Sequence, residues 1–64
     1  MTHEVRTYKN GKCVYQAHFQ NAESAYNEYL DNIRLIKKYS KKGEETTVVR
    51  LNEGAVMAIE TIIG

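Results

Sequence analysis

The sequence predicts an α+β domain of the order ββαββ, in which one long helix packs on one face of a four-stranded, mostly antiparallel sheet. Three observations predict this fold. Asn10 and Gly11 join two stretches rich in β-branched and aromatic residues, and an Asn-Gly pair in this setting is the strongest short-range signal of a β-hairpin. Between Ala22 and Ile36, apolar residues then recur at the spacing of a helix. After Gly43, residues 46–63 are again dense in β-branched residues, which favours a second hairpin.

We expect the helix to cover residues 22–42. Asn21 is a suitable N-cap, because its side-chain oxygen can accept from free backbone N–H groups of the first turn, and Gly43 is a suitable C′ residue. Leu35 and Tyr39 lie outside the main apolar stripe, and they either cover a flank of the core or form an exposed anchor for a partner. At about 100° per residue, the stripe itself holds Ala22, Ala25, Tyr26, Tyr29, Leu30, Ile33 and Ile36.

We expect the first hairpin at residues 2–19. If Asn10 and Gly11 form the loop, His3 faces His18, but two ligands are too few for a metal site. Cys13 lies on the face that we assign to the helix, where a small buried thiol is the usual case and a nucleophile is not expected. That face, the more apolar of the two, holds Glu4, Arg6, Tyr8, Cys13, Tyr15, Ala17 and Phe19.

The second hairpin is expected at residues 46–63, with a three-residue loop at 52–54. Residues 55–63 also fit a helical face, which would give ββαβα, but the β-branched residues and the preceding loop favour a strand. This last strand is apolar on both sides, and one helix covers only one face of a sheet. We therefore expect an uncovered apolar face, of the kind that usually marks an interface, with Val5 and Val14 as further candidates beside Val48, Val56, Ala58 and Ile62.

Length and composition narrow the classes of protein. The 64 residues form a single domain, 1–64, and so small a core usually needs support such as self-association. The single cysteine excludes an intrachain disulfide and a Cys-pair zinc motif. The formal net charge of +1 differs from the strongly basic character of most nucleic-acid binders. The sequence shows no signal-peptide pattern and no apolar run long enough to span a bilayer, so we expect a cytoplasmic location.

The sequence contains no glycine-rich phosphate loop, no triad and no metal spacing, so we expect neither an enzyme nor a cofactor. The favoured function is a protein-interaction module, acting as a homodimer or as an inhibitor or adaptor of another protein. Its surface would be the uncovered sheet face together with Leu35 and Tyr39. The alternative is nucleic-acid binding by the basic end of the helix. The same charges also fit a solvated helix C-terminus, where the helix dipole favours cations. The basic residues of this end are Arg34, Lys37, Lys38, Lys41 and Lys42.

In its size, single cysteine, near-neutral charge and lack of catalytic motifs, the chain looks similar to small accessory proteins of bacteriophages and bacterial mobile elements. This resemblance is one of general type and rests on no motif. It implies an inhibitor that occupies a host protein, and it assigns a role to no residue.

Overall fold

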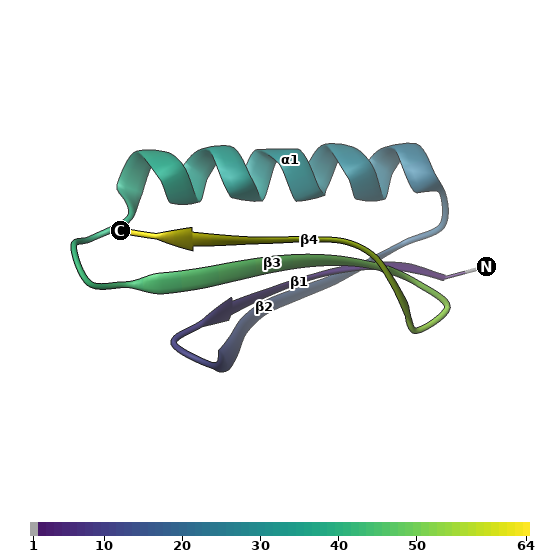
Figure 1. Ribbon diagram of the computed structural model, residues 1–64. Coiled ribbons are helices and arrows are strands. Elements are labelled where there is room, and N and C mark those ends of the chain that lie inside the picture. The colour runs from purple at the N-terminus through teal and green to yellow at the C-terminus, as the bar shows by residue number, and fades with distance from the viewer. Residues whose placement is uncertain (1) are drawn as a thin grey trace.

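The computed structural model describes residues 2–64 and confirms the order ββαββ. Strands β1 (His3–Lys9) and β2 (Lys12–Phe19) form the first hairpin, helix α1 (Ala22–Tyr39) follows, and strands β3 (Glu45–Asn52) and β4 (Ala55–Ile63) form the second. Within these residues the strands make one open sheet in the order β2-β1-β3-β4, and every neighbouring pair is antiparallel. Figure 1 shows α1 along one face of this sheet, with no other element on the opposite face.

The helix begins where the sequence predicts and ends earlier. The Asn21 side chain accepts a hydrogen bond from the Ser24 backbone N–H at 2.8 Å, as expected of an N-cap. The predicted end at residue 42 is wrong, because Ser40 already has an extended backbone (φ −63°, ψ 135°). A separate turn follows, in which the Glu44 N–H donates to the Lys41 carbonyl at 3.1 Å. Gly43, with φ +88°, belongs to this turn and is not the C′ residue.

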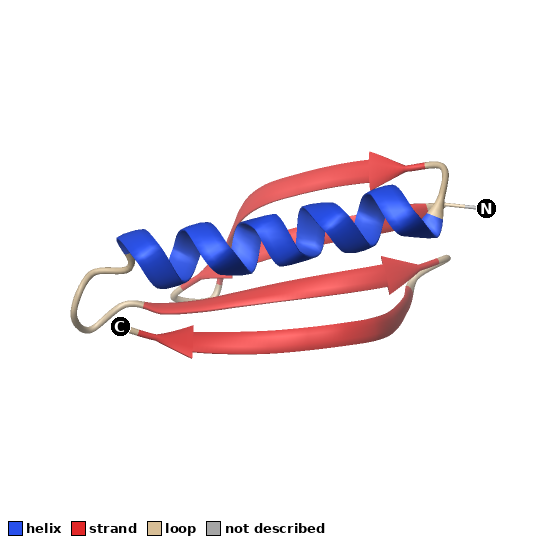
Figure 2. Ribbon diagram, turned by 90° about the horizontal axis from the view of Figure 1, so that it is seen from above, coloured by secondary structure: helices blue, strands red, loops and turns tan. Residues whose placement is uncertain are grey.

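The helix crosses from one hairpin to the other over the middle of the sheet. Strands β2 and β3 run parallel, because each is antiparallel to β1, which lies between them. Figure 2 shows α1 lying over the middle of the sheet, with β2 on one side of the helix and β3 and β4 on the other. The two central strands therefore supply the sheet side of the core.

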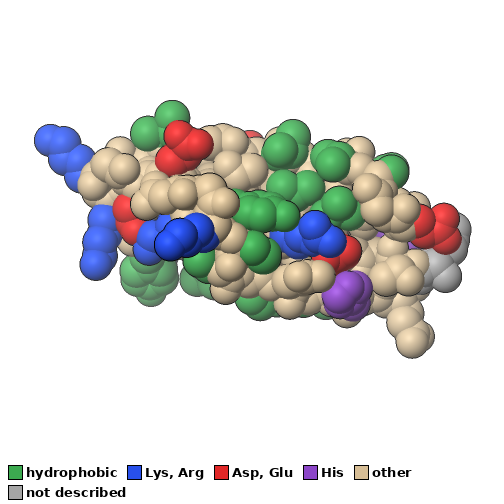
Figure 3. Space-filling model, turned by 90° about the horizontal axis from the view of Figure 1, so that it is seen from below, with side chains coloured by type: hydrophobic (Ala, Val, Ile, Leu, Met, Phe, Trp, Pro, Cys, Tyr) green, Lys and Arg blue, Asp and Glu red, His purple; other side chains and the backbone are tan. Residues whose placement is uncertain are grey.

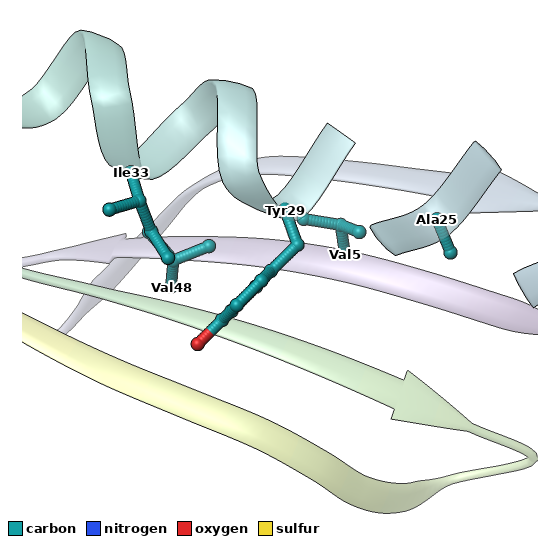
Figure 4. Close-up of a cluster of buried hydrophobic side chains, with 5 residues drawn as sticks. All are labelled: Val5, Ala25, Tyr29, Ile33 and Val48. Carbon is teal, nitrogen blue, oxygen red and sulfur yellow. The ribbon is translucent and has the colours of Figure 1, made fainter. Parts of the chain in front are cut away.

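The core is a small cluster between α1 and these central strands. Val5 of β1 and Val48 of β3 are fully buried beneath the helix. Ala25, Tyr29 and Ile33 pack onto them from α1 (Figure 4). These three are spaced by one helical turn, so the predicted stripe is confirmed at its centre. Its margin is more open: Leu30 and Ile36 are half-buried, whereas Ala22 and Tyr26 are exposed.

The first hairpin follows the predicted register only beside its turn. Asn10 and Gly11 have φ values of +50° and +84°, as a type I′ turn requires. Tyr8 faces Cys13 as predicted, but a register shift follows, so that Val14 of β2 is an additional residue. Such a bulge offsets all later pairs by one residue, and an offset of one residue exchanges the two faces of a strand relative to its neighbour.

The face assigned to the helix is therefore wrong for the β1 half of this hairpin. Val5 lies in the core beneath α1, and because side chains alternate along a strand, His3 and Thr7 share its face. Glu4, Arg6 and Tyr8 consequently lie on the opposite face, away from the helix. The β2 half was assigned correctly beyond the bulge, since its residues pair with the helix-facing residues of β1: Tyr15, Ala17 and Phe19.

The bulge also separates the two histidines. His3 faces Phe19 and His18 faces Glu4, so the predicted His3–His18 pair does not exist and its members lie on opposite faces. His3 is buried and His18 is exposed. The prediction of a buried Cys13 is also wrong, because Cys13 lies beside the turn, before the bulge, and its side chain is exposed.

The second hairpin confirms that residues 55–63 form a strand, which excludes the ββαβα alternative. Its loop has two residues and not three: Asn52 pairs with Ala55, and Glu53 and Gly54 have φ values of +52° and +83°. A second register shift makes Met57 an additional residue. Together these changes place Val48 opposite Glu60 in place of the predicted Ala58.

Candidate protein-interaction face

The structure has an uncovered sheet face, but most of its residues differ from the prediction. Val48 is fully buried under α1, and Ala58 and Ile62 pack against the same core. These three residues are therefore not available on the uncovered face, and neither is Val5. The reason is that the helix covers the opposite side of the second hairpin from the one that apolarity alone suggests. Of the predicted sheet-face residues, Val56 alone is exposed there.

We define the open face as the side of the sheet that faces away from α1. Its apolar part lies over β3 and β4, and we call it the apolar strip: Val49, Leu51, Val56, Ile59 and Ile63. The two β3 members, Val49 and Leu51, are buried to 7% exposure and form its floor. The β4 members project from it, with exposures of 58% for Val56, 61% for Ile59 and 74% for Ile63.

Figure 3 shows the open face, where hydrophobic side chains gather in a continuous region beside a few charged groups. Single exposed apolar side chains are normal on a protein surface, whereas a contiguous patch usually marks a contact site. Four members of the strip are contiguous, because Val49 pairs with Ile59 and Leu51 pairs with Val56 across the two strands. Ile63 lies beyond them on the same face, past the hydrogen-bonded pair of Thr47 and Thr61. Sequence reasoning missed Val49, Leu51, Ile59 and Ile63, which lie on the face that it had assigned to the helix.

A polar cluster forms the other half of the open face, over β1 and β2. At its centre the Glu4 carboxylate is nearly buried and accepts hydrogen bonds from the Arg6 guanidinium and the Gln16 amide. The His18 ring lies 3.8 Å away from the same carboxylate. The hydrogen bond from Arg6 holds the pKa of Glu4 below its usual value, against the opposing effect of burial. The open face thus has an apolar half and a charged, internally paired half.

A second apolar surface lies between α1 and the first hairpin. It is a groove of about 350 Å³. Leu35 and Tyr39 line it from the helix, and both are largely exposed. Val14, which the bulge adds to β2, lines it from the sheet. The structure thus places Leu35 and Tyr39 together at the surface, and their role as a partner anchor stays a prediction.

The basic residues of the helix end are partly engaged within the chain. Arg34 lies 3.3 Å from Asp31, and Lys37 lies 3.6 Å from Glu60 of β4. The Lys38 ammonium stands 5.4 Å from the centre of the Tyr39 ring. Lys41 and Lys42 are exposed.

The turn of the first hairpin reaches the same end of the molecule as these lysines. The Asn10 N–H donates to the Glu45 carbonyl at 2.8 Å, and the Lys9 ammonium pairs with Glu44. Lys9 and its neighbour Lys12 are thereby brought toward Lys41, although Glu44 lies among them.

Within residues 2–64, no group of three or more His, Cys, Asp and Glu side chains is arranged to hold a metal ion. No helix in the described part of the chain is long and apolar enough to cross a membrane. The fold and its surfaces define a small α+β domain with one face of its sheet uncovered. Comparison with protein-family models, with curated proteins and with solved structures found no match to this chain.

Proposed function

We propose that this chain is a non-enzymatic interaction module that binds another protein through the apolar strip. One observation carries the proposal: Val56, Ile59 and Ile63 project from β4 on a face that no other element of residues 2–64 covers. The partner that fits is a folded protein with an apolar patch of its own. The polar cluster around Glu4 supports the proposal, because interfaces commonly combine an apolar centre with a polar rim.

Burial of the strip can supply enough free energy to hold a partner. Transferring a fully exposed Ile side chain into an apolar contact stabilises a complex by about 1.5–3 kcal/mol, and Ile59 and Ile63 are both more than half exposed. Val49 and Leu51 are already buried in the free chain, so little side-chain freedom is lost at these two positions on binding. Replacing Ile59 with Asp would place an unpaired carboxylate in the contact, which costs several kcal/mol.

The test compares Ile59→Asp with Leu35→Asp. Leu35→Asp is a matched apolar-to-acidic change in the groove between α1 and the first hairpin, away from the open face. Each variant is first checked for a folded far-UV circular dichroism spectrum. Proteins captured by the wild-type chain are then purified and titrated against all three chains. We expect Ile59→Asp to weaken binding by about 100-fold or more, in line with a loss near 3 kcal/mol, and Leu35→Asp to bind as wild type.

Two results would count against this proposal. If Ile59→Asp binds its partner as tightly as the wild-type chain does, the apolar strip is not the contact surface. If Leu35→Asp loses binding while Ile59→Asp retains it, the groove between α1 and the first hairpin is the contact surface instead.

A second candidate function is nucleic-acid binding at the basic end of the molecule. The observation that favours it is the approach of Lys9 and Lys12 to the helix end, which adds to the exposed charges of Lys41 and Lys42. Glu44 counts against nucleic-acid binding, because its negative charge pairs with Lys9 within this region.

This candidate predicts binding that weakens steeply with salt, because phosphate contacts release counterions. The double variant Lys38→Glu with Lys41→Glu should abolish that binding. Absent binding by the wild-type chain, or binding that does not respond to salt, would end the hypothesis.

A further inference from the structure

Strand β4 is an edge strand of unusual character. It is the longest strand that residues 2–64 form, with nine residues, and within this range it has β3 on one side and no strand on the other. Natural edge strands are commonly short or protected by Lys or Pro residues. β4 contains neither Lys nor Pro, and Glu60 is its one charged residue. Its outer edge therefore presents unpaired backbone groups, and beyond the bulge at Met57 the charge of Glu60 is its one protection.

The hydrogen bonds at the end of the sheet show which residues of β4 direct their backbone groups outward. The Gly64 N–H donates to the Glu44 carbonyl at 2.8 Å, so residue 64 bonds toward β3. In an antiparallel ladder consecutive residues alternate between the two sides. Ile63, Thr61 and Ile59 therefore direct their N–H and C=O groups away from β3. The pairing is regular from Ala58 onward, because the register shift lies nearer the loop.

We propose that the outer edge of β4 pairs with β4 of a second copy of this chain, antiparallel and centred on Thr61. A strand edge paired with itself about a two-fold axis meets its own pattern of donors and acceptors, so a second copy satisfies every outward group in the paired segment. Pairing with a second copy would also stabilise this domain, whose core is small, since small domains often gain stability by association.

The charge and the bulge of β4 select this register among the alternatives. A pair centred on Glu60 would place this carboxylate opposite its own copy, and like charges directly opposite are destabilising. A pair centred on Ile59 would run into the irregular backbone at Met57. A pair centred on Ile62 would leave the outward groups of Ile59 without a partner.

Centring on Thr61 avoids all three problems. Ile59 then faces Ile63 of the second copy, and Glu60 faces Ile62 of the second copy. Glu60 does not become an unpaired charge, because Lys37 of its own helix lies 3.6 Å away. The pairing uses the whole regular part of the strand.

In this arrangement the two sheets become one continuous sheet with both helices on the same side. The apolar strips of the two copies join into a longer surface on the other side. The inference does not rest on the proposed function, because it uses the backbone edge of β4, which lies in the plane of the sheet. The side chains of the strip project out of that plane and remain free to contact another protein.

The first test is the solution mass by light scattering over a concentration series, for the wild type, Thr61→Pro and Thr61→Val. Proline removes an outward N–H and no backbone hydrogen bond to β3, so Thr61→Pro should fold and yield a monomer. It also loses the hydrogen bond between the Thr61 and Thr47 hydroxyl groups, but Thr61→Val loses that bond as well and so controls for it. Thr61→Val keeps the N–H and should dimerise like the wild type, at twice the chain mass of 7.4 kDa. Binding of a protein partner through the strip should survive in Thr61→Pro, which separates this inference from the proposed function.

The second test does not depend on how well the proline variant folds. In a Cys13→Ser background, Thr61→Cys should form an intermolecular disulfide on mild oxidation, because facing residues in an antiparallel pair lie about 5.5 Å apart between Cα atoms. Lys42→Cys in the same background is the exposed control and should remain uncrosslinked. A wild-type chain that stays monomeric, a folded Thr61→Pro that still dimerises, or equal crosslinking of both cysteines would each overturn the inference.

Discussion

Shortening Val48 to alanine tests which face of the second hairpin is covered. Val48 is fully buried and lies beneath Tyr29 and Ile33 of the helix (Figure 4). Val56 is the same residue type in the same hairpin, but it lies on the open face and is 58% exposed. Val48→Ala and Val56→Ala therefore make the same chemical change on opposite sides of the sheet.

The expected difference in stability follows from burial. Val48→Ala removes two methyl groups from the core, which costs about 1.6 kcal/mol at about 0.8 kcal/mol per buried group. The cavity that remains beneath the helix raises the loss to about 2–3 kcal/mol. A small domain is stable by only about 3–5 kcal/mol, so this variant should be close to unfolding. Val56→Ala removes mostly exposed atoms and should change the free energy of unfolding by less than about 0.5 kcal/mol.

Urea denaturation followed by circular dichroism measures both values, at a protein concentration below that at which light scattering detects association. With a slope of about 1 kcal/mol per molar urea, the midpoint of Val48→Ala should fall by about 2–3 M. The midpoint of Val56→Ala should stay close to that of the wild type. Equal losses in the two variants, or a larger loss in Val56→Ala, would refute the assignment of the covered and open faces.

Three further variants test local features. Asn21→Ala should lower the free energy of unfolding by about 1 kcal/mol in urea denaturation, because the Ser24 N–H loses its partner. Gly54→Ala should also lower it by about 1 kcal/mol, since φ is +83° and a β-carbon is strained there although nothing lies in its way. Gly54→Asn should cost less, because Asn tolerates positive φ better than Ala, and equal losses in the two variants would contradict this reason. For Glu4, the lowered pKa means that the ionised form stabilises the fold: this contribution is fully present above the ordinary value of 4.5 and is lost as the pH falls through the lower folded value. The stability difference between the wild type and Glu4→Gln should therefore shrink in acid, and a difference that is the same at every pH would contradict the role of the charge.

Local sequence rules were sufficient to predict the elements and their order. Asn10-Gly11 specified a two-residue turn because both positions need positive φ. Asn21 specified the start of the helix through its side-chain oxygen. The spacing of Ala25, Tyr29 and Ile33 specified its buried side. Each of these signals acts over a few residues and does not depend on the rest of the fold.

The two bulges explain why the register was not predictable. Val14 and Met57 are unremarkable strand residues, and neither carries a local signal that one strand will gain a residue over its neighbour. Each bulge exchanges the faces of the residues beyond it. The error in the covered face of the first hairpin, the expected His3–His18 pair and the expected burial of Cys13 all follow from the missed bulge in β2.

The sequence was sufficient to predict that an uncovered apolar face exists, but not which residues form it. The apolar character of β4 on both sides correctly indicated that one apolar face would stay uncovered. The rule that the more apolar face packs on the helix then failed, because α1 accommodates two charged residues of the sheet. Lys37 approaches Glu60, and the Tyr26 ring lies 5.8 Å from the guanidinium of Arg50. These contacts join residues distant in sequence, which no local pattern reveals.

The exposure of the apolar strip can be measured directly by methyl NMR with a soluble paramagnetic agent. Methyl groups labelled in Ile, Leu and Val would be observed at low protein concentration, where the chain is monomeric. We predict strong broadening of Ile59 and Ile63 on the open face and little broadening of Val48 and Ile33 beneath the helix. Broadening of Val48 equal to that of Ile59, or protection of Ile59 and Ile63, would contradict the assignment of the open face, on which the proposed function rests.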